Sequence, residues 1–235
     1  MIETLKQWIA ESDSIVFFGG AGVSTESGIP DFRSTDGLYH QQYDYPPESI
    51  LSHTFYECNP EEFFRFYRAK MLAPEAKPNA AHHKLAQWER EGKLKAVITQ
   101  NIDGLHQAAG SKNVLELHGS VLRNYCESCG KFHDLDFILG SKGVPVCRCG
   151  GCVKPDVVLY EEGLNQDTIE KSVRAIEDAD MLIIGGTSLN VYPAAGLVNY
   201  YRGRKLVLIN KSAVARDLAA DLVITDPIGQ VLSQI

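Results

Sequence analysis

Short runs of consecutive apolar residues recur along the chain, and polar stretches with helical periodicity separate them. The runs are nearly continuous rather than alternating, as expected of strands that helices cover on both faces of a sheet. They occupy residues 14–18, 95–99, 180–186, 205–210 and 221–225. Helices are predicted at residues 80–91, capped by Asn79 and ended by Gly92, and at residues 166–179. This alternation of strands and helices predicts an open α/β sheet.

Two segments interrupt the alternation. Residues 35–78 include a helix that Asn59 and Pro60 are placed to open, and residues 119–155 hold five of the six cysteines with little periodicity. Both are predicted to be insertions that together form a smaller domain. The α/β domain then comprises residues 1–34, 79–118 and 156–235.

Charge and hydropathy narrow the class of protein. The net charge of -7 argues against broad nucleic-acid binding, which needs a basic surface. No apolar run is long enough to span a bilayer, so no membrane association is expected. Residues 1–12 lack the apolar core of a signal peptide and predict an amphipathic helix instead. A cytoplasmic chain is expected, and in that reducing setting the six cysteines do not predict a disulfide framework.

The cysteines form two closely spaced groups. Cys126 and Cys129 make a C-x-x-C pair, and Cys147, Cys149 and Cys152 follow after 17 residues. Two cysteine pairs at this separation predict a four-thiolate zinc site, and the short polar insert makes free cysteines the weaker alternative. Four thiolates leave no open coordination position, so the zinc is expected to be structural. By spacing alone, Cys149 and Cys152 make the better second pair.

A glycine-containing loop follows the first predicted strand. Gly20 and Gly22 indicate a tight turn with exposed amides, and a helix that begins near Ser24 would direct its positive end at a phosphate. The dinucleotide fingerprint G-x-G-x-x-G is incomplete, because Thr25 stands at its third glycine. A turn without a ligand explains the glycines equally well.

Small and polar residues follow three more predicted strands, at the carboxyl ends where ligands of open α/β sheets gather. They are Gln100, Asn101, Asp103, Gly186, Thr187, Ser188 and Asn210. Taken singly, each is also explained by turn formation or capping. His118 stands at the boundary between the α/β domain and the cysteine insert. A histidine is the natural general base near neutral pH, although a lone histidine is more often structural.

Taken together and in this order, seven segments resemble the sirtuins, the NAD-dependent protein lysine deacylases, in a compact bacterial-type form. The segments are GAGVSTESGIPDFRS, TQNIDGLH, LHGS, the paired cysteines, KPDVVLYEE, GTSLNVYPAA and LINKS. They extend over nearly the whole chain. The resemblance implies a Rossmann-like sheet with helices on both faces, NAD as co-substrate, one structural Zn²⁺ and acyl-lysine proteins or peptides as substrates.

The resemblance also implies a role for each segment. In catalysis, His118 accepts a ribose hydroxyl proton in a pocket that Asn101 helps to frame, and the products are nicotinamide, free lysine and 2′-O-acyl-ADP-ribose. Phe32 covers the reacting face of the ribose. The implied NAD contacts are Gly20, Ala21, Gly22, Thr25, Asp31, Phe32, Arg33, Gln100, Asn101, Ile102, Asp103, Gly186, Thr187, Ser188, Asn210, Lys211 and Ser212. The implied substrate contacts, which pair with an extended peptide as added strands, are His118, Val157, Val158, Leu159, Tyr160, Val191 and Tyr192.

The resemblance and the spacing argument predict different cysteines for the second pair of zinc ligands. In sirtuins that pair ends in a cysteine followed by Gly-Gly and an apolar residue, which implies Cys147 and Cys149 as ligands and Cys152 as a packed free thiol. Acetyl is the expected acyl group, with longer apolar acyl chains left open by the sequence, and succinyl or malonyl groups are not expected. Sirtuins that favour acidic acyl groups carry a Tyr-x-x-Arg pair, and here no arginine lies between Arg33 and Arg65.

Two other functions fit parts of the same pattern. An ADP-ribosyltransferase would use the same NAD pocket but pass ADP-ribose to a protein nucleophile. A non-catalytic module would bind NAD or acyl-lysine without turnover. The presence of both His118 and Asn101 favours deacylation over these alternatives.

Overall fold

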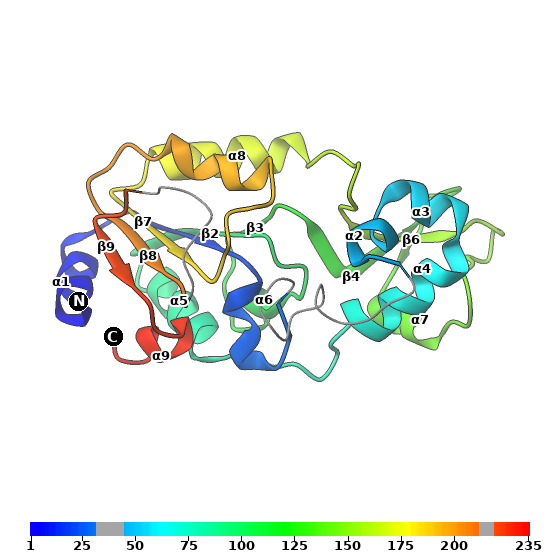
Figure 1. Ribbon diagram of the computed structural model, residues 1–235, viewed down its shortest axis with the longest axis horizontal. Helices are drawn as coiled ribbons and strands as arrows, with labels where there is room; N and C mark the ends of the chain where they lie inside the picture. Colours follow the sequence, from blue (N-terminus) through cyan, green and yellow to red (C-terminus); the bar gives the residue numbers. More distant parts are fainter. Residues whose placement is uncertain (32–44, 212–218) are drawn as a thin grey trace.

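A parallel sheet forms the centre of the larger part of the protein. The structure is a computed structural model that describes residues 1–31, 45–211 and 219–235. Within them, six strands pair in the order β3-β2-β1-β7-β8-β9, each parallel to its neighbour (Figure 1). The strands are β1 (Ile15–Gly19), β2 (Leu94–Thr99), β3 (Val114–Glu116), β7 (Met181–Gly185), β8 (Leu206–Ile209) and β9 (Leu222–Ile224). The predicted open α/β sheet is confirmed.

Helices cover both faces of this sheet because successive strand side chains point to opposite faces. On β1, Phe17 packs into one apolar core and Phe18 into the other, and neither is exposed. The Phe17 core takes side chains from α1 (Ile2–Glu11), α5 (Ala80–Arg90) and α9 (Ile228–Leu232). The Phe18 core takes them from α8 (Gln166–Glu177), which lies along the top of the sheet in Figure 1, and from a 3₁₀ helix at Ala194–Tyr200.

The predicted start and end of α5 are confirmed. The Asn79 side chain accepts a hydrogen bond from the Ala81 amide at 2.9 Å, and the Asn79 amide donates to Nδ1 of His82 at 3.2 Å. This reciprocal arrangement is a capping box, which satisfies amides that the first helical turn leaves unpaired. Gly92 follows the helix with φ of +78°, a left-handed conformation that glycine adopts without steric cost.

A second, antiparallel sheet and a group of short helices share a separate core. The strands lie in the order β5-β4-β6, and they are β4 (Gly119–Cys126), β5 (Phe132–His133) and β6 (Val153–Val157). The helices are α2 (Pro47–Ile50), α3 (His53–Cys58), α4 (Pro60–Phe66), α7 (Leu135–Gly140) and a π-helical turn at Tyr67–Met71. Phe63, Phe64 and Tyr67 from the helices pack with Val121 and Val153 from the strands. The two predicted inserts therefore share one core, and the exact domain boundaries stay a proposal.

Two local features differ from the sequence expectations. No long helix begins near Ser24, because two 3₁₀ turns, Ala21–Val23 and Thr25–Ser27, follow β1 instead and end at Gly28 with φ of +84°. The short edge strand β3 was not predicted. Its three residues are only partly buried, so they lack the continuous apolar run that marks the central strands.

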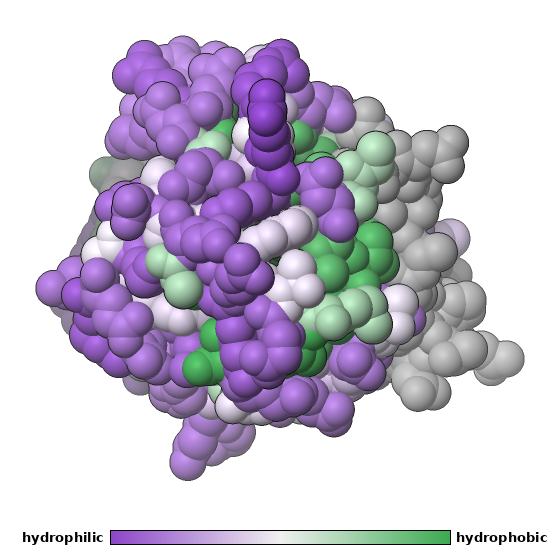
Figure 2. Space-filling view, turned by 90° about the vertical axis from the view of Figure 1, so that its left-hand side faces the viewer, coloured by the Kyte–Doolittle hydropathy of each residue, from purple (hydrophilic) through white to green (hydrophobic). Residues whose placement is uncertain are grey.

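The outer surface near the chain ends is mostly hydrophilic. Figure 2 shows the face that carries α1 and the C-terminus, with hydrophobic residues gathered in a smaller area. Among the described residues, no helix combines the length and the apolar character needed to cross a bilayer.

Candidate active site

The carboxyl ends of β1, β2, β7 and β8 open onto one cleft of about 1150 Å³, which also reaches residues beside the small sheet. The predicted site residues that line it are Gly20, Ala21, Gly22, Thr25, Asp31, Gln100, Asn101, Ile102, Asp103, His118, Val157, Val158, Leu159, Tyr160, Gly186, Thr187, Ser188, Val191, Tyr192, Asn210 and Lys211. Phe32, Arg33 and Ser212 lie outside the described residues. The described cofactor and substrate candidates thus share one cleft.

Gly20 and Gly22 allow the loop after β1 to approach the loop after β7. The Gly22 amide donates to the carbonyl oxygen of Gly186 at 2.8 Å, and the Gly20 amide donates to that of Gly185 at 3.3 Å. A Cβ atom on Gly22 would lie 2.8 Å from the Gly186 Cα, so only glycine fits this contact. Both amides are used within the protein, contrary to the expectation that they stay exposed for a phosphate. The glycines serve close packing at the base of the cleft.

Asn79 fixes the same loop from the other side. Its side-chain nitrogen donates to the Val23 carbonyl oxygen at 2.8 Å and to the Ser27 hydroxyl at 2.9 Å. Because the oxygen of the same amide caps α5, one side chain joins the loop to the helix beneath it. Contacts within the protein therefore hold this part of the loop in place.

Ser24 links the loop to the polar residues that follow β2. Its hydroxyl donates to Oδ2 of Asp103 at 2.6 Å and accepts from the side-chain amide of Asn101 at 3.1 Å. The other Asp103 oxygen accepts from the Leu105 amide at 2.9 Å, at the start of α6 (Leu105–Ala108). Ser24 lines the cleft but was not among the predicted site residues, because a serine in a turn gives no distinctive sequence signal.

His118 lies between β3 and β4, at the point where the chain leaves the large sheet. Its Nδ1 atom is 2.9 Å from the carbonyl oxygen of Gln100. A carbonyl oxygen only accepts, so Nδ1 carries the proton and Nε2 keeps the basic lone pair. Burial lowers the pKa of His118, while the hydrogen bond to the Gln100 backbone raises it, and the net pKa lies below the ordinary histidine value. The imidazole is therefore neutral at pH 7.

Comparison with known proteins identifies the family. The family model described as the Sir2 family matches residues 20–193. The chain belongs to the Sir2 family. It is similar to the NAD-dependent protein deacetylase of Clostridium acetobutylicum, at 63% identity over 100% of this chain and 97% of the relative. The enzyme of the same name from Clostridium perfringens is also 63% identical, over 100% of this chain and 98% of the relative.

Solved Sir2 structures have the same fold. A Sir2 variant with a deacetylated p53 peptide and 3′-O-acetyl-ADP-ribose superimposes with a TM-score of 0.91 at 38% identity, over 99% of this chain and 96% of that one. A Sir2 structure bound to an acetylated peptide gives a TM-score of 0.86 at 36% identity, over 100% and 96% of the two chains. The predicted sirtuin family and its Rossmann-like fold are confirmed.

The predicted substrate segment of this Sir2 chain already has one edge paired. The Val158 amide donates to the His118 carbonyl oxygen, and the Tyr160 amide donates to that of Leu51, both at 3.0 Å. The His53 amide in turn donates to the Tyr160 carbonyl oxygen at 3.0 Å. On the opposite edge, the Leu159 amide donates to Oε2 of Glu162 at 2.8 Å, and the Leu159 carbonyl oxygen accepts from the Glu162 amide at 3.1 Å. Val191 and Tyr192 line the same cleft, and Tyr192 is 61% exposed.

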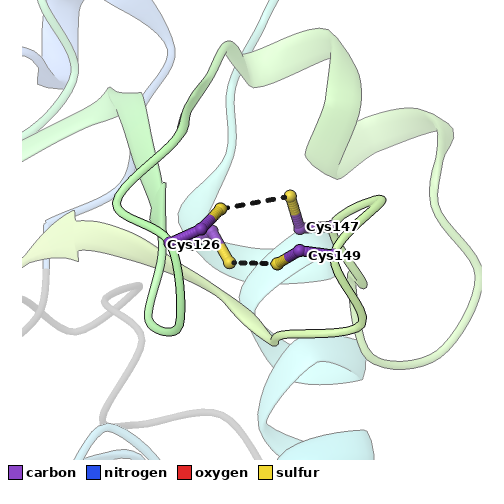
Figure 3. A group of neighbouring side chains, drawn as sticks. Cys126, Cys147 and Cys149 are labelled. Atoms are coloured by element: carbon purple, nitrogen blue, oxygen red, sulfur yellow. Dashed lines mark hydrogen bonds between the residues drawn. The ribbon is translucent and has the colours of Figure 1, made fainter.

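Four thiols gather in the small part of this Sir2 fold (Figure 3). The Sγ atoms of Cys126, Cys129, Cys147 and Cys149 all lie within 4.8 Å of one another. Tetrahedral zinc with Zn–S bonds of about 2.3 Å requires sulfur separations of about 3.8 Å. The Cys126–Cys149 and Cys129–Cys147 separations of 3.4 and 3.9 Å match that requirement. The thiol cluster therefore fits a structural Zn²⁺.

The Cys152 thiol lies outside this cluster. Its Sγ atom lies 3.2 Å from the hydroxyl oxygen of Tyr56, which donates to Glu127 at 2.8 Å. A tight turn explains the short C-x-C spacing: the Gly150 amide donates to the Cys147 carbonyl oxygen at 2.9 Å, with Gly150 at φ of +91°. This turn brings Cys147 and Cys149 into the same cluster. The geometry favours them over Cys152 as ligands.

Proposed function

We propose that this Sir2 chain is an NAD-dependent protein lysine deacetylase, which moves an acetyl group from lysine to ADP-ribose and releases nicotinamide. The observation that carries the proposal is the contact between Nδ1 of His118 and the Gln100 carbonyl oxygen, in a cleft shared with the glycine loop. That contact orients a neutral imidazole with its basic nitrogen available. Names of relatives at 63% identity over the full chain support the same activity.

His118 is proposed to accept a proton from a ribose hydroxyl, so that the hydroxyl oxygen can attack the acyl group. The hydrogen bond to Gln100 holds the ring in one tautomer. Burial keeps its pKa low, so the base is present in its active, unprotonated form at neutral pH. The hydrogen bond therefore orients the His118 ring, and the low pKa keeps the ring able to accept a proton.

Polar residues after β2 are proposed to hold the reacting half of NAD, which supplies the ribose carbon and the nicotinamide leaving group. Asn101 is only 8% exposed, and its amide is oriented by Ser24. Ser24 also fixes the carboxylate of Asp103, the group proposed to bind the nicotinamide carboxamide. Gln100 donates to the Thr187 hydroxyl at 3.0 Å, which ties this region to the residues proposed for the adenosine half: Gly186, Thr187, Ser188, Asn210 and Lys211.

Acyl-lysine proteins or peptides are the proposed partners, held as an added strand between residues 157–160 and residues 191–192. Backbone pairing of this kind reads few side chains, so several sequence contexts fit. Nucleic-acid binding is not expected of a chain with net charge -7. We also propose a cytoplasmic location, because a reducing compartment keeps a thiol cluster available for metal.

One structural Zn²⁺ is proposed at the four-thiol cluster of Cys126, Cys129, Cys147 and Cys149. Four thiolates fill a tetrahedral shell, so the metal supplies no chemistry to the reaction. Its proposed effect is to join the turn after β4 to the segment before β6.

A product analysis tests the proposed function. The purified protein is incubated with an acetyl-lysine peptide, with and without NAD, and the products are separated and weighed by mass spectrometry. Nicotinamide, O-acetyl-ADP-ribose and the deacetylated peptide are expected only with NAD. Attachment of ADP-ribose to a protein would indicate the transferase alternative, and binding without any product would indicate a non-catalytic module.

A further inference from the structure

Two residues that are not glycine adopt positive φ angles in the described part of the chain, and both stand in the proposed walls of the peptide groove. Glu161 has φ of +76° and Leu189 has φ of +54°. Side chains with a Cβ atom are disfavoured in this left-handed region, and such strain persists only where the surroundings hold it. Glu161 directly follows the predicted substrate segment, and Leu189 precedes Val191 in the opposite segment.

The Glu161 conformation is held by its own side chain. Oε2 accepts hydrogen bonds from the amide of Thr54 at 2.9 Å and from the hydroxyl of Thr54 at 2.7 Å. Both bonds lower the pKa of the Glu161 carboxyl, and the bond from the Thr54 amide has the larger effect. The carboxyl is therefore ionised at neutral pH. Thr54 lies in the first turn of α3, on the small side of the protein.

The next residue fixes the same turn from the other direction. Oε2 of Glu162 accepts from the Leu159 amide at 2.8 Å, and Oε1 lies 2.9 Å from Nδ1 of His53 and 3.1 Å from Nζ of Lys154. Two consecutive carboxylates thus attach the segment after β6 to α3 and to β6 itself. Tyr160, one residue before Glu161, is bonded through both backbone groups to Leu51 and His53.

We infer that Glu161 is a positioning residue for substrate binding, whose bonds to Thr54 hold residues 158–161 in the turn that lines the cleft. The inference rests on the proposed function for the identity of the peptide. Glu161 acts through the backbone of residues 158–161 rather than through a charge directed at the substrate. The α3 helix therefore sets the geometry of the peptide edge, while the NAD half of the cleft is held separately by Ser24 and Asn79.

Three substitutions separate positioning from direct charge recognition. Thr54→Val removes one donor and leaves the Glu161 charge, whereas Glu161→Gln removes the charge and leaves an oxygen that accepts from Thr54. Glu161→Gly removes both the bond and the φ strain. Positioning predicts that Thr54→Val and Glu161→Gly raise the KM for an acetyl-lysine peptide by about three- to tenfold, as expected for losing a charge-assisted hydrogen bond. The positioning role also predicts a smaller rise in the peptide KM for Glu161→Gln. The KM for NAD should be unchanged in all three variants.

Glu48→Gln, on the exposed surface of α2, is the matched control and should change neither KM. If Glu161→Gln raises the peptide KM and Thr54→Val does not, the carboxylate acts by its charge and the inference is wrong. A lower apparent kcat with unchanged KM values for peptide and NAD would indicate loss of folded protein instead, and would also overturn the inference.

A second measurement does not depend on catalysis. Hydrogen–deuterium exchange of the free protein should show faster exchange in the fragment around residues 158–162 for Thr54→Val and Glu161→Gly, and unchanged exchange around the glycine loop. Unchanged exchange in both fragments would overturn the inference even if the protein proves to be a deacetylase. If the wild-type protein forms no deacetylated product, the proposed function fails. In that case, hydrogen–deuterium exchange and the affinity for an acetyl peptide, measured by calorimetry, still test whether Glu161 positions the peptide-binding segment.

Discussion

The Nδ1 atom of His118 lies 2.9 Å from the carbonyl oxygen of Gln100. The contact joins the second residue after β3 to the first residue after β2, so the proposed base is fixed by the carboxyl end of the large sheet. His118→Ala is expected to lower kcat for deacetylation by about 100- to 10,000-fold, the usual contribution of a general base. NAD affinity, measured by calorimetry, should stay close to wild type. Turnover near the wild-type rate in this variant would show that another group is the base.

The pH profile of the reaction follows from the same residue. Burial holds the pKa of His118 below its ordinary value of 6.5. The unprotonated ring is the active form, so kcat/KM for the peptide is expected to be level near pH 7. It should fall on the acid side, with an apparent pKa below 6.5. An acid limb centred above pH 6.5 would contradict the effect of burial on the pKa of His118.

The acyl group expected to give the highest kcat/KM is acetyl rather than succinyl. No arginine is among the described residues that line the cleft, and the sequence has none between Arg33 and Arg65. A succinyl carboxylate would then enter the site without a guanidinium partner, and burying an unpaired charge is unfavourable. Parallel assays with acetyl and succinyl forms of one peptide measure the order, and a preference for succinyl would contradict it.

Metal analysis of two cysteine variants tests the zinc site. Cys147→Ala should lose zinc and lower the melting temperature, because it removes one of the four clustered thiols. Cys152→Ala should keep one zinc per chain, since that thiol contacts Tyr56 instead. Zinc lost from the second variant and kept in the first would reverse the assignment.

Acid should destabilise the fold through two buried histidines. The rings of His82 and His106 lie 4.7 Å apart, and each is at most 1% exposed. Burial lowers the pKa of His106 to about 3 and that of His82 to about 4, the latter despite the nearby Asp103 carboxylate. Below pH 6.5 the unfolded chain takes up protons that the folded protein does not. The free energy of unfolding should therefore fall with pH from about 6.5 down to these lower values, by up to about 1.4 kcal/mol per pH unit for each histidine.

Urea unfolding at several pH values measures this dependence. His106→Leu should flatten the loss between pH 6.5 and pH 5, because one depressed histidine is gone. Equal slopes in the variant and the wild-type protein would show that these histidines do not determine acid stability.

The central strands were predictable because burial on both faces requires continuous apolar runs, as in residues 14–18. The glycine loop was harder. Gly20 and Gly22 line the cleft, but the amides that were expected to be exposed bond to Gly185 and Gly186, which lie more than 160 residues away in sequence. A contact of that range has no local signal. Ser24 was missed for the same reason, because its role depends on Asp103 and Asn101.

The metal pair shows the limit of spacing arguments. Cys149 and Cys152 have the more usual spacing, but the turn at Gly150 places Cys147 beside Cys129 and leaves Cys152 against Tyr56. The resemblance to sirtuins had implied Cys147 and Cys149, the two thiols that the fold brings beside Cys126 and Cys129. Phe32, Arg33 and Ser212 lie outside the described residues, and their roles stay predictions.

The cleft takes residues from Gly20, near the amino end of the chain, and from Ile228, near its carboxyl end. During translation these segments leave the ribosome in sequence order. A nascent chain that has emerged as far as β7 already carries all four clustered cysteines, but it lacks β8 and the Asn210 and Lys211 that follow it. Zinc capture can therefore precede translation of β8 and β9, whereas the cleft takes its full lining only after β8 and the segment at Ile228 have followed.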